Sequence, residues 1–105
     1  MNITIQSIHF TANAALLDFV ETKVKKLGTF YSNILHAEIY LKLEPSETDE
    51  NKVAEIKLNI PGSSLFAKER CKTFEESTDL AIESLVRQLE KQKRREQTQP
   101  SALSN

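Results

Sequence analysis

The chain has 105 residues, of which 39% are hydrophobic and 28% charged, and its formal net charge is −1. This length fits one domain with one core, and the composition excludes collagen-like and low-complexity proteins. The single cysteine, Cys71, excludes an internal disulfide, and no apolar run is long enough to cross a membrane. The N-terminus has no apolar segment typical of a signal peptide, so we expect a cytoplasmic protein.

The first half of the chain predicts a strand, a helix and a second strand. Residues 2–9 alternate apolar and polar side chains, as half-buried strands do, and residues 37–44 repeat this pattern. Between them we expect a helix over 12–27, with Thr11 as its N-cap and Gly28 as its end. Apolar residues spaced three or four apart form one stripe along this helix: Leu16, Phe19, Val20, Val24 and Leu27.

Two further strands follow a polar turn. Residues 52–60 and 65–73 predict the third and fourth strands, and the Pro-Gly-Ser-Ser sequence of 61–64 predicts the turn between them. In the third strand, the alternation places Val53 on the outward face and Ala54 on the inward face.

A second helix is expected over 75–95. Its apolar stripe consists of Ala81, Ile82, Leu85, Val86 and Leu89. The element order is therefore β-α-β-β-β-α, an α+β fold with a four-stranded mixed sheet and both helices packed on one face. We expect one domain over 1–95, followed by a short disordered tail over 96–105.

Charge is distributed unevenly along this fold. Residues 85–95 have a net charge of +4, whereas residues 38–55 have a net charge of −4. The molecule is therefore a dipole, and it is the local field of such a protein that steers a charged partner, even when the total charge is close to zero.

The basic residues of the two helices are the candidate binding site. Those of the second helix fall opposite its apolar stripe and form one ridge, at a spacing that suits a phosphate backbone: Arg87, Lys91, Arg94 and Arg95. A solvated helix end that favours the helix dipole is the alternative. On the first helix, Lys23 and Lys26 are surface neighbours, and Lys23 lies near the groove between the helices. A lysine that covers its own core is the alternative there. Together, the two clusters predict one cationic groove.

The fourth strand has a third basic row, made of Lys68, Arg70 and Lys72. We expect cross-strand pairing with Glu55 and Glu69 to neutralise it.

Catalytic chemistry has little support in the sequence. The chain has only His9, His36 and Cys71 as nitrogen or sulfur ligands, which is too few for a zinc site, and no known motif joins them. A phosphate-binding glycine-rich loop is also absent. We therefore expect no enzyme activity, no metal and no cofactor, and a structural role for Cys71.

Three segments are distinctive: the chain opens with N-I-T, has F-V-E-T-K-V-K-K-L in its first helix, and has D-L-A-I-E-S-L-V-R-Q-L-E-K-Q-K in its second. These segments resemble the ribosome hibernation-promoting factor family, also called ribosome-associated inhibitors or sigma-54 modulation proteins. The resemblance covers residues 1–95. It implies a fold similar to a double-stranded-RNA-binding domain and a translation inhibitor that binds the small ribosomal subunit and its rRNA. It further implies binding in the channel used by mRNA and by A- and P-site tRNA, competition with both, and inactive, protected ribosomes during stress or stationary phase.

The resemblance also implies roles for particular residues. The rRNA contacts of the family fall here on Lys23 and Lys26, and on Lys91 and Arg95 with contributions from Arg87 and Arg94. Where many members have Asp-Met-Tyr, this chain has Ser-Thr-Asp at 77–79, and Gln88 stands where lysine is common. The C-terminal dimerisation domain of long members has no counterpart here, so we expect a short form. Neither DNA nor membrane is an expected partner. The alternative function is a protein-interaction module that has a charged sheet face and binds no ribosome.

Overall fold

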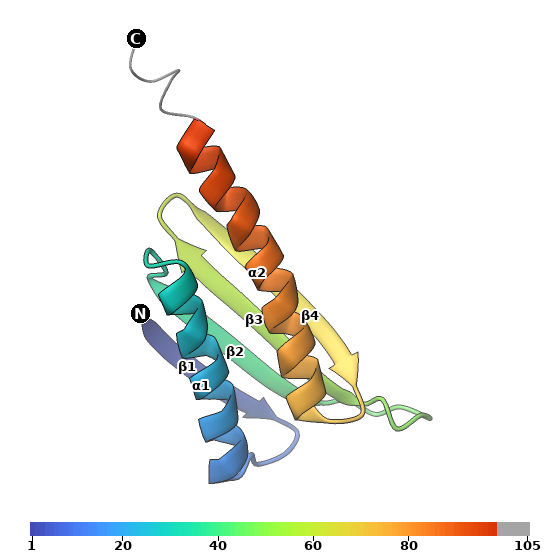
Figure 1. Ribbon diagram of the computed structural model, residues 1–105. Coiled ribbons are helices and arrows are strands. Elements are labelled where there is room, and N and C mark those ends of the chain that lie inside the picture. The colour runs from blue at the N-terminus through green and yellow to red at the C-terminus, as the bar shows by residue number, and fades with distance from the viewer. Residues whose placement is uncertain (99–105) are drawn as a thin grey trace.

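The computed structural model describes residues 1–98 and has the predicted element order β-α-β-β-β-α (Figure 1). Its elements are β1 (Asn2–Ile8), α1 (Ala14–Phe30), β2 (His36–Leu43), β3 (Lys52–Ile60), β4 (Ser63–Cys71) and α2 (Phe74–Thr98). The sheet order is β1-β2-β3-β4, with β1 parallel to β2 and the other neighbours antiparallel. The predicted α+β fold with a four-stranded mixed sheet is confirmed.

Both helices lie on the same face of the sheet and run in roughly the same direction, so that their C-terminal ends point the same way (Figure 1). The core lies between this face and the helices, because the apolar stripes predicted for both helices point into it. Fully buried members of the core include Val20, Val24, Ile39, Leu41, Ile56, Leu58, Leu85 and Leu89. Each such side chain contributes about 1.5–3 kcal/mol relative to an exposed one, so the stripes hold both helices to the sheet.

The limits of α1 differ from the prediction at both ends. Asn13, and not Thr11, is the N-cap, and its side-chain oxygen accepts a hydrogen bond from the Leu16 N–H at 2.9 Å. The helix continues through Gly28 to Phe30, because Phe30 and the buried residue that follows it pack against the core. Gly28 instead leaves space for the N-terminus, since a β-carbon there would lie 3.1 Å from the terminal methyl group of the first methionine.

The helix α2 is also longer than predicted. It begins at Phe74, where the Thr73 hydroxyl caps the helix by accepting a hydrogen bond from the Glu76 N–H at 3.1 Å. It ends at Thr98, so the first three residues of the predicted tail, 96–98, are helical. The disorder predicted for 99–105 falls outside the described residues.

The turn between β3 and β4 is tighter than predicted. Ile60 pairs with Ser63, so Pro61 and Gly62 alone form the connection, and β4 begins inside the segment expected to be the turn. Gly62 has a φ of 76°, which glycine adopts without steric cost.

Val53 is fully buried although it lies on the outward face, alternating with Ala54 on the inward face. Its cross-strand neighbours are Lys42 and Arg70, and the long aliphatic parts of these two side chains flank Val53 on the sheet surface.

Candidate nucleic-acid interface

The open face of the sheet pairs its own charges. Lys42 Nζ lies 2.8 Å from a Glu55 carboxylate oxygen, and Lys68 Nζ lies 3.7 Å from the same oxygen. Arg70 forms a salt bridge with Glu44. The predicted neutralisation of the basic row on β4 is thus confirmed for Lys68, with Glu55 as its partner.

The second acid of this network differs from the prediction. Glu69 pairs in register with Ala54, a buried residue of the inward face, so it lies on the other face from Arg70. Glu44 takes its place because it follows β2 directly and reaches Arg70 across the sheet.

Hydrogen bonds satisfy the remaining acid of the open face. Glu38 accepts hydrogen bonds from the side-chain amide of Asn59 at 3.3 Å and from the Tyr40 hydroxyl at 3.2 Å. These two bonds lower the pKa of the Glu38 carboxyl, and the bond from its own hydroxyl to Glu38 raises the pKa of Tyr40. Because most charges on this face already have partners, it offers little free positive charge to a nucleic acid.

On the helical face, several exposed basic residues have no salt-bridge partner among residues 1–98, whereas most charges on the open face of the sheet are paired. Lys26, Arg87 and Lys91 are exposed, and none of them forms a salt bridge with any residue of the described range 1–98. Arg94 and Arg95 are exposed as well, close to the C-terminal end of α2. Five of the six basic residues singled out from the sequence therefore present their side chains to solvent on the two helices.

Lys23 lies between the two helices, as predicted. Its Nζ atom lies 3.2 Å from Asp79 Oδ1 of α2 and 5.3 Å from the centre of the Phe19 ring. The lysine side chain is 33% exposed, so it is half-buried beside the core and already has an anionic partner.

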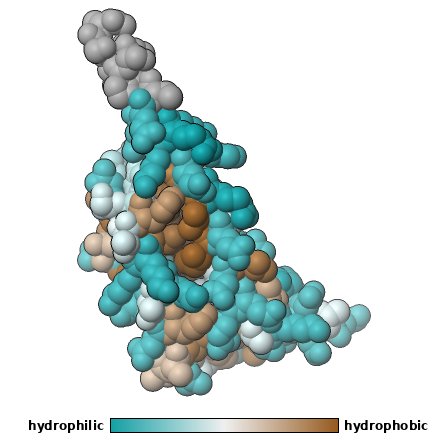
Figure 2. Space-filling model, in the orientation of Figure 1, coloured by the Kyte–Doolittle hydropathy of each residue, from teal (hydrophilic) through white to brown (hydrophobic). Residues whose placement is uncertain are grey.

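Apolar side chains lie between the helices and hydrophilic ones surround them (Figure 2). The partly buried residues that α1 and α2 pack against the core include Phe19, Phe30, Ile82 and Val86. The exposed basic residues Arg87 and Lys91 lie on the side of α2 opposite the buried Leu85 and Leu89, so they face solvent and leave the surface between the helices apolar.

The basic end of α2 has contacts that the sequence did not predict. The Tyr31 hydroxyl donates a hydrogen bond to Glu96 Oε2 at 2.5 Å, and Lys93 Nζ lies 4.2 Å from the centre of the Phe30 ring. Burial is the main cause that raises the pKa of Tyr31 to about 12, and the bond to Glu96 adds to it. The same bond, together with one from Gln92, lowers the pKa of the Glu96 carboxyl.

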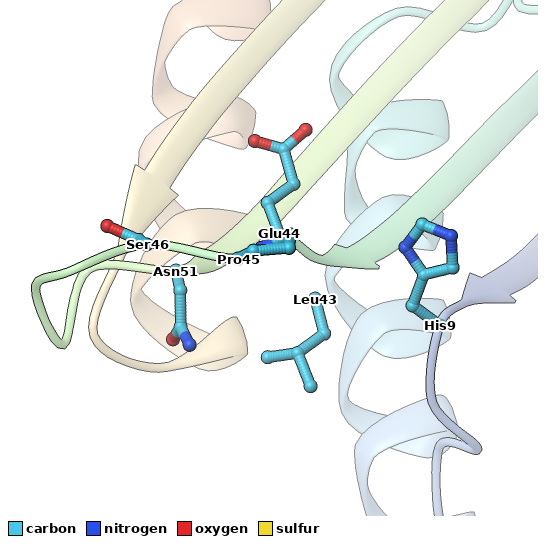
Figure 3. Close-up of a pocket in the computed structure, with 6 residues that line it drawn as sticks. All are labelled: His9, Leu43, Glu44, Pro45, Ser46 and Asn51. Atoms are coloured by element: carbon cyan, nitrogen blue, oxygen red, sulfur yellow. The ribbon is translucent and has the colours of Figure 1, made fainter.

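The remaining candidate sites are weak. A shallow pocket of about 440 Å³ is lined by His9, Leu43, Glu44, Pro45, Ser46 and Asn51. Figure 3 shows that Glu44 points to one side of the chain whereas Leu43 and Asn51 point to the other, so the polar groups do not converge. Residues 1–98 contain no group of three or more His, Cys, Asp or Glu side chains that would hold a metal ion.

Cys71 has the features of a structural residue. It is buried, and burial raises the pKa of its thiol, which is opposite to what a reactive thiolate requires. Across the described part of the chain, no helix is both long and apolar enough to traverse a bilayer.

Comparisons with known proteins agree on one family. Residues 3–97 match the family described as sigma 54 modulation protein / S30EA ribosomal protein. A ribosome hibernation promoting factor of Klebsiella oxytoca is 31% identical over 93 residues, which cover 89% of this chain and 92% of that protein. Another, from Acidithiobacillus ferridurans, is 29% identical over 68 residues, which cover 65% of this chain and 86% of the relative.

Solved structures show the same fold. A ribosomal subunit interface protein from Coxiella burnetii superposes with a TM-score of 0.78 at 22% identity, covering 89% of this chain and 98% of the other. The N-terminal domain of Protein Y from Thermus thermophilus superposes with a TM-score of 0.73 at 25% identity, covering 87% of this chain and 98% of that domain.

Proposed function

The chain belongs to the sigma 54 modulation protein / S30EA ribosomal protein family, and from this premise we propose that it inhibits translation by binding the small ribosomal subunit. The proposed site on the subunit is the mRNA and tRNA channel, in the region of the A and P sites. Bound there, the protein keeps ribosomes inactive and protected during stress or stationary phase.

The contrast between the two faces of the molecule supports this proposal best. On the sheet face, Lys42, Lys68 and Arg70 are paired with acids of the same face. On the helical face, Lys26, Arg87 and Lys91 have no salt-bridge partner within residues 1–98, and two exposed arginines follow at the end of α2. Phosphates can therefore bind Lys26, Arg87 and Lys91 without breaking salt bridges, whereas on the sheet face they would have to break them.

The proposed contacts are with the rRNA backbone. The six basic residues are Lys23, Lys26, Arg87, Lys91, Arg94 and Arg95. Lysine and arginine bind phosphate oxygens without reading sequence, and structured RNA is recognised largely through its shape and its backbone. Inhibition then follows from occlusion, because the bound protein fills space that mRNA and tRNA require. No covalent step is involved.

Competition on isolated small subunits tests the proposal. Labelled initiator tRNA with mRNA and this protein are bound to the same subunits at fixed salt, separately and together, and retained complexes are quantified by filter binding. Mutual loss of affinity is expected, with inhibition stoichiometric with ribosomes and reversed by excess tRNA and mRNA. Simultaneous binding with unchanged affinities would exclude occlusion.

The alternative is a protein-interaction module that uses its charged sheet face. The internal pairing of Glu55 and Glu44 with the basic side chains of that face disfavours it, because a partner would have to break these contacts. Co-sedimentation separates the two functions. A ribosome binder pellets with small subunits and is released from them by salt or ribonuclease. A protein adaptor does not pellet with small subunits.

A further inference from the structure

The last two turns of α2 extend past the core. Leu89 is the last fully buried side chain of this helix up to residue 97, and residues 90–97 are exposed or half-exposed. This segment contains three of the six proposed RNA-binding residues, Lys91, Arg94 and Arg95. A helix end without a packed apolar face frays easily, and its charged side chains then lose their fixed positions.

Contacts from the end of α1 oppose this fraying. Tyr31, only 4% exposed, donates its hydroxyl to Glu96 Oε2 at 2.5 Å. Gln92 donates to the same oxygen at 3.1 Å, one helical turn earlier. Lys93 Nζ lies over the Phe30 ring at 4.2 Å from its centre. The end of α1 thus contacts α2 at positions on either side of Arg94 and Arg95.

Glu96 is otherwise misplaced. A carboxylate in the last turn of a helix opposes the helix dipole, and among basic residues it reduces the positive field that attracts phosphate. The hydrogen bonds from Tyr31 and Gln92 lower the pKa of its carboxyl, so they favour the charged form. The charge of Glu96 alone would weaken an RNA-binding segment, so its hydrogen bond with Tyr31 is the feature that explains a glutamate at this position.

We propose that Phe30, Tyr31, Lys93 and Glu96 form a clamp that positions the basic end of α2 relative to Lys23 and Lys26 of α1. None of the four needs to touch RNA. The clamp holds Lys91, Arg94 and Arg95 in the arrangement they have when bound, so less conformational freedom is lost on binding. This inference rests on the proposed function, because it assigns the clamp a role in binding the small subunit.

Two acidic residues of the same helix provide the test. Glu90 is exposed and makes no hydrogen bond or salt bridge to the described residues, whereas Glu96 accepts from Tyr31. If only charge mattered, Glu90→Ala and Glu96→Ala would both strengthen binding to small subunits, about twofold each. The clamp predicts opposite signs, with Glu96→Ala weakening binding about threefold to tenfold.

Two conservative variants separate positioning from folding. Tyr31→Phe removes only the hydroxyl and should weaken binding by a similar factor, whereas Glu96→Gln keeps an acceptor for Tyr31 and should bind at least as well as the unmodified protein. Hydrogen exchange of the free proteins should be faster at the amides of 92–97 in Tyr31→Phe and Glu96→Ala, with the amides of the sheet unchanged.

The outcomes distinguish the two proposals. If Glu96→Ala binds as tightly as Glu90→Ala, or if exchange at 92–97 is unchanged in Tyr31→Phe, the clamp is wrong while the proposed function stands. If the unmodified protein does not bind small subunits at all, the proposed function fails and the positioning role fails with it. In that case, the exchange measurement on the free protein still reports whether the contact orders the end of α2.

Discussion

Lys23 Nζ of α1 and Asp79 Oδ1 of α2 lie 3.2 Å apart, which places a carboxylate beside the one proposed phosphate-binding lysine that sits between the helices. The side chains are 33% and 45% exposed, so the pair is screened by solvent and contributes at most about 1 kcal/mol to stability. A phosphate that binds Lys23 must compete with Asp79. We therefore expect the pair to weaken the proposed binding of RNA phosphate at Lys23.

Removing this competitor should strengthen binding. We expect Asp79→Asn to raise affinity for the small subunit about twofold to fivefold, because it frees Lys23 and removes a negative charge. Glu83→Gln is the matched control, since Glu83 is an exposed acid one turn further along α2 without a salt bridge to residues 1–98. Equal gains in the two variants would show that release of Lys23 contributes nothing.

The assignment of the helical face predicts which charges matter. Neutralising Arg87 and Lys91 together, each to Gln, should lower affinity about tenfold or more, because two phosphate contacts are lost. The control neutralises Lys57 and Lys72, which are also exposed but lie on or beside the sheet. Titration of labelled variants with small subunits measures both. A loss in the control as large as that in the helical variant would contradict the assignment.

Salt dependence tests the nature of the contacts. If about five side chains neutralise phosphates, the logarithm of affinity should fall with the logarithm of salt concentration with a slope of about −3.5 to −4.5. The neutralised variant of Arg87 and Lys91 should give a shallower slope. A slope near zero for the unmodified protein would indicate a contact with ribosomal protein in place of rRNA.

The sequence predicted the regular parts of the fold because alternation and helical spacing are local. The limits predicted for the third strand coincide with those of β3, Lys52–Ile60. The position of Lys23 near the groove was predicted in the same way, from its place beside the apolar stripe of α1. The predicted ends of the helices were wrong where tertiary contacts determine where the helix stops. Gly28 favours a helix end, but burial of Tyr31 extends the helix beyond it.

The contacts that shape the candidate site were not predictable in this way. Tyr31 and Glu96 are 65 positions apart, and no local pattern links them. Asp79 is one of the acidic residues near the start of α2, and its role as the partner of Lys23 depends on how α1 and α2 pack side by side. Spacing identifies the side of a helix on which a charge lies, but the packed structure decides which opposite charge it meets.

The first turns of α2 contain a buried polar group without a partner. Thr78 is fully buried, and its hydroxyl makes no hydrogen bond to the described residues. Thr78→Val replaces the hydroxyl with a methyl group of similar size and should stabilise the protein by about 1 kcal/mol. Chemical denaturation measures the change.

Ser77 provides the contrast for this test. It is equally buried, but its hydroxyl donates to the Phe74 carbonyl at 3.1 Å, so Ser77→Ala removes a satisfied group and should not stabilise. A Thr78→Val protein that unfolds at the same or lower denaturant concentration would mean that the hydroxyl is satisfied.

The Tyr31–Glu96 contact predicts a loss of stability at alkaline pH. Folding raises the pKa of Tyr31 from its ordinary value of 10.0 to about 12, so the folded state favours the neutral phenol. The resulting stabilisation is fully present below pH 10 and is lost as pH rises from 10 towards 12, because the tyrosinate is buried beside the Glu96 carboxylate.

The denaturation midpoint should therefore fall as pH rises from 10 to 12, and Tyr31→Phe should remove the part of this fall that Tyr31 causes. Tyr40, whose pKa is also raised by its bond to Glu38, remains in this variant as an internal comparison. If both proteins lose stability in parallel between pH 10 and 12, Tyr31 is not the group responsible.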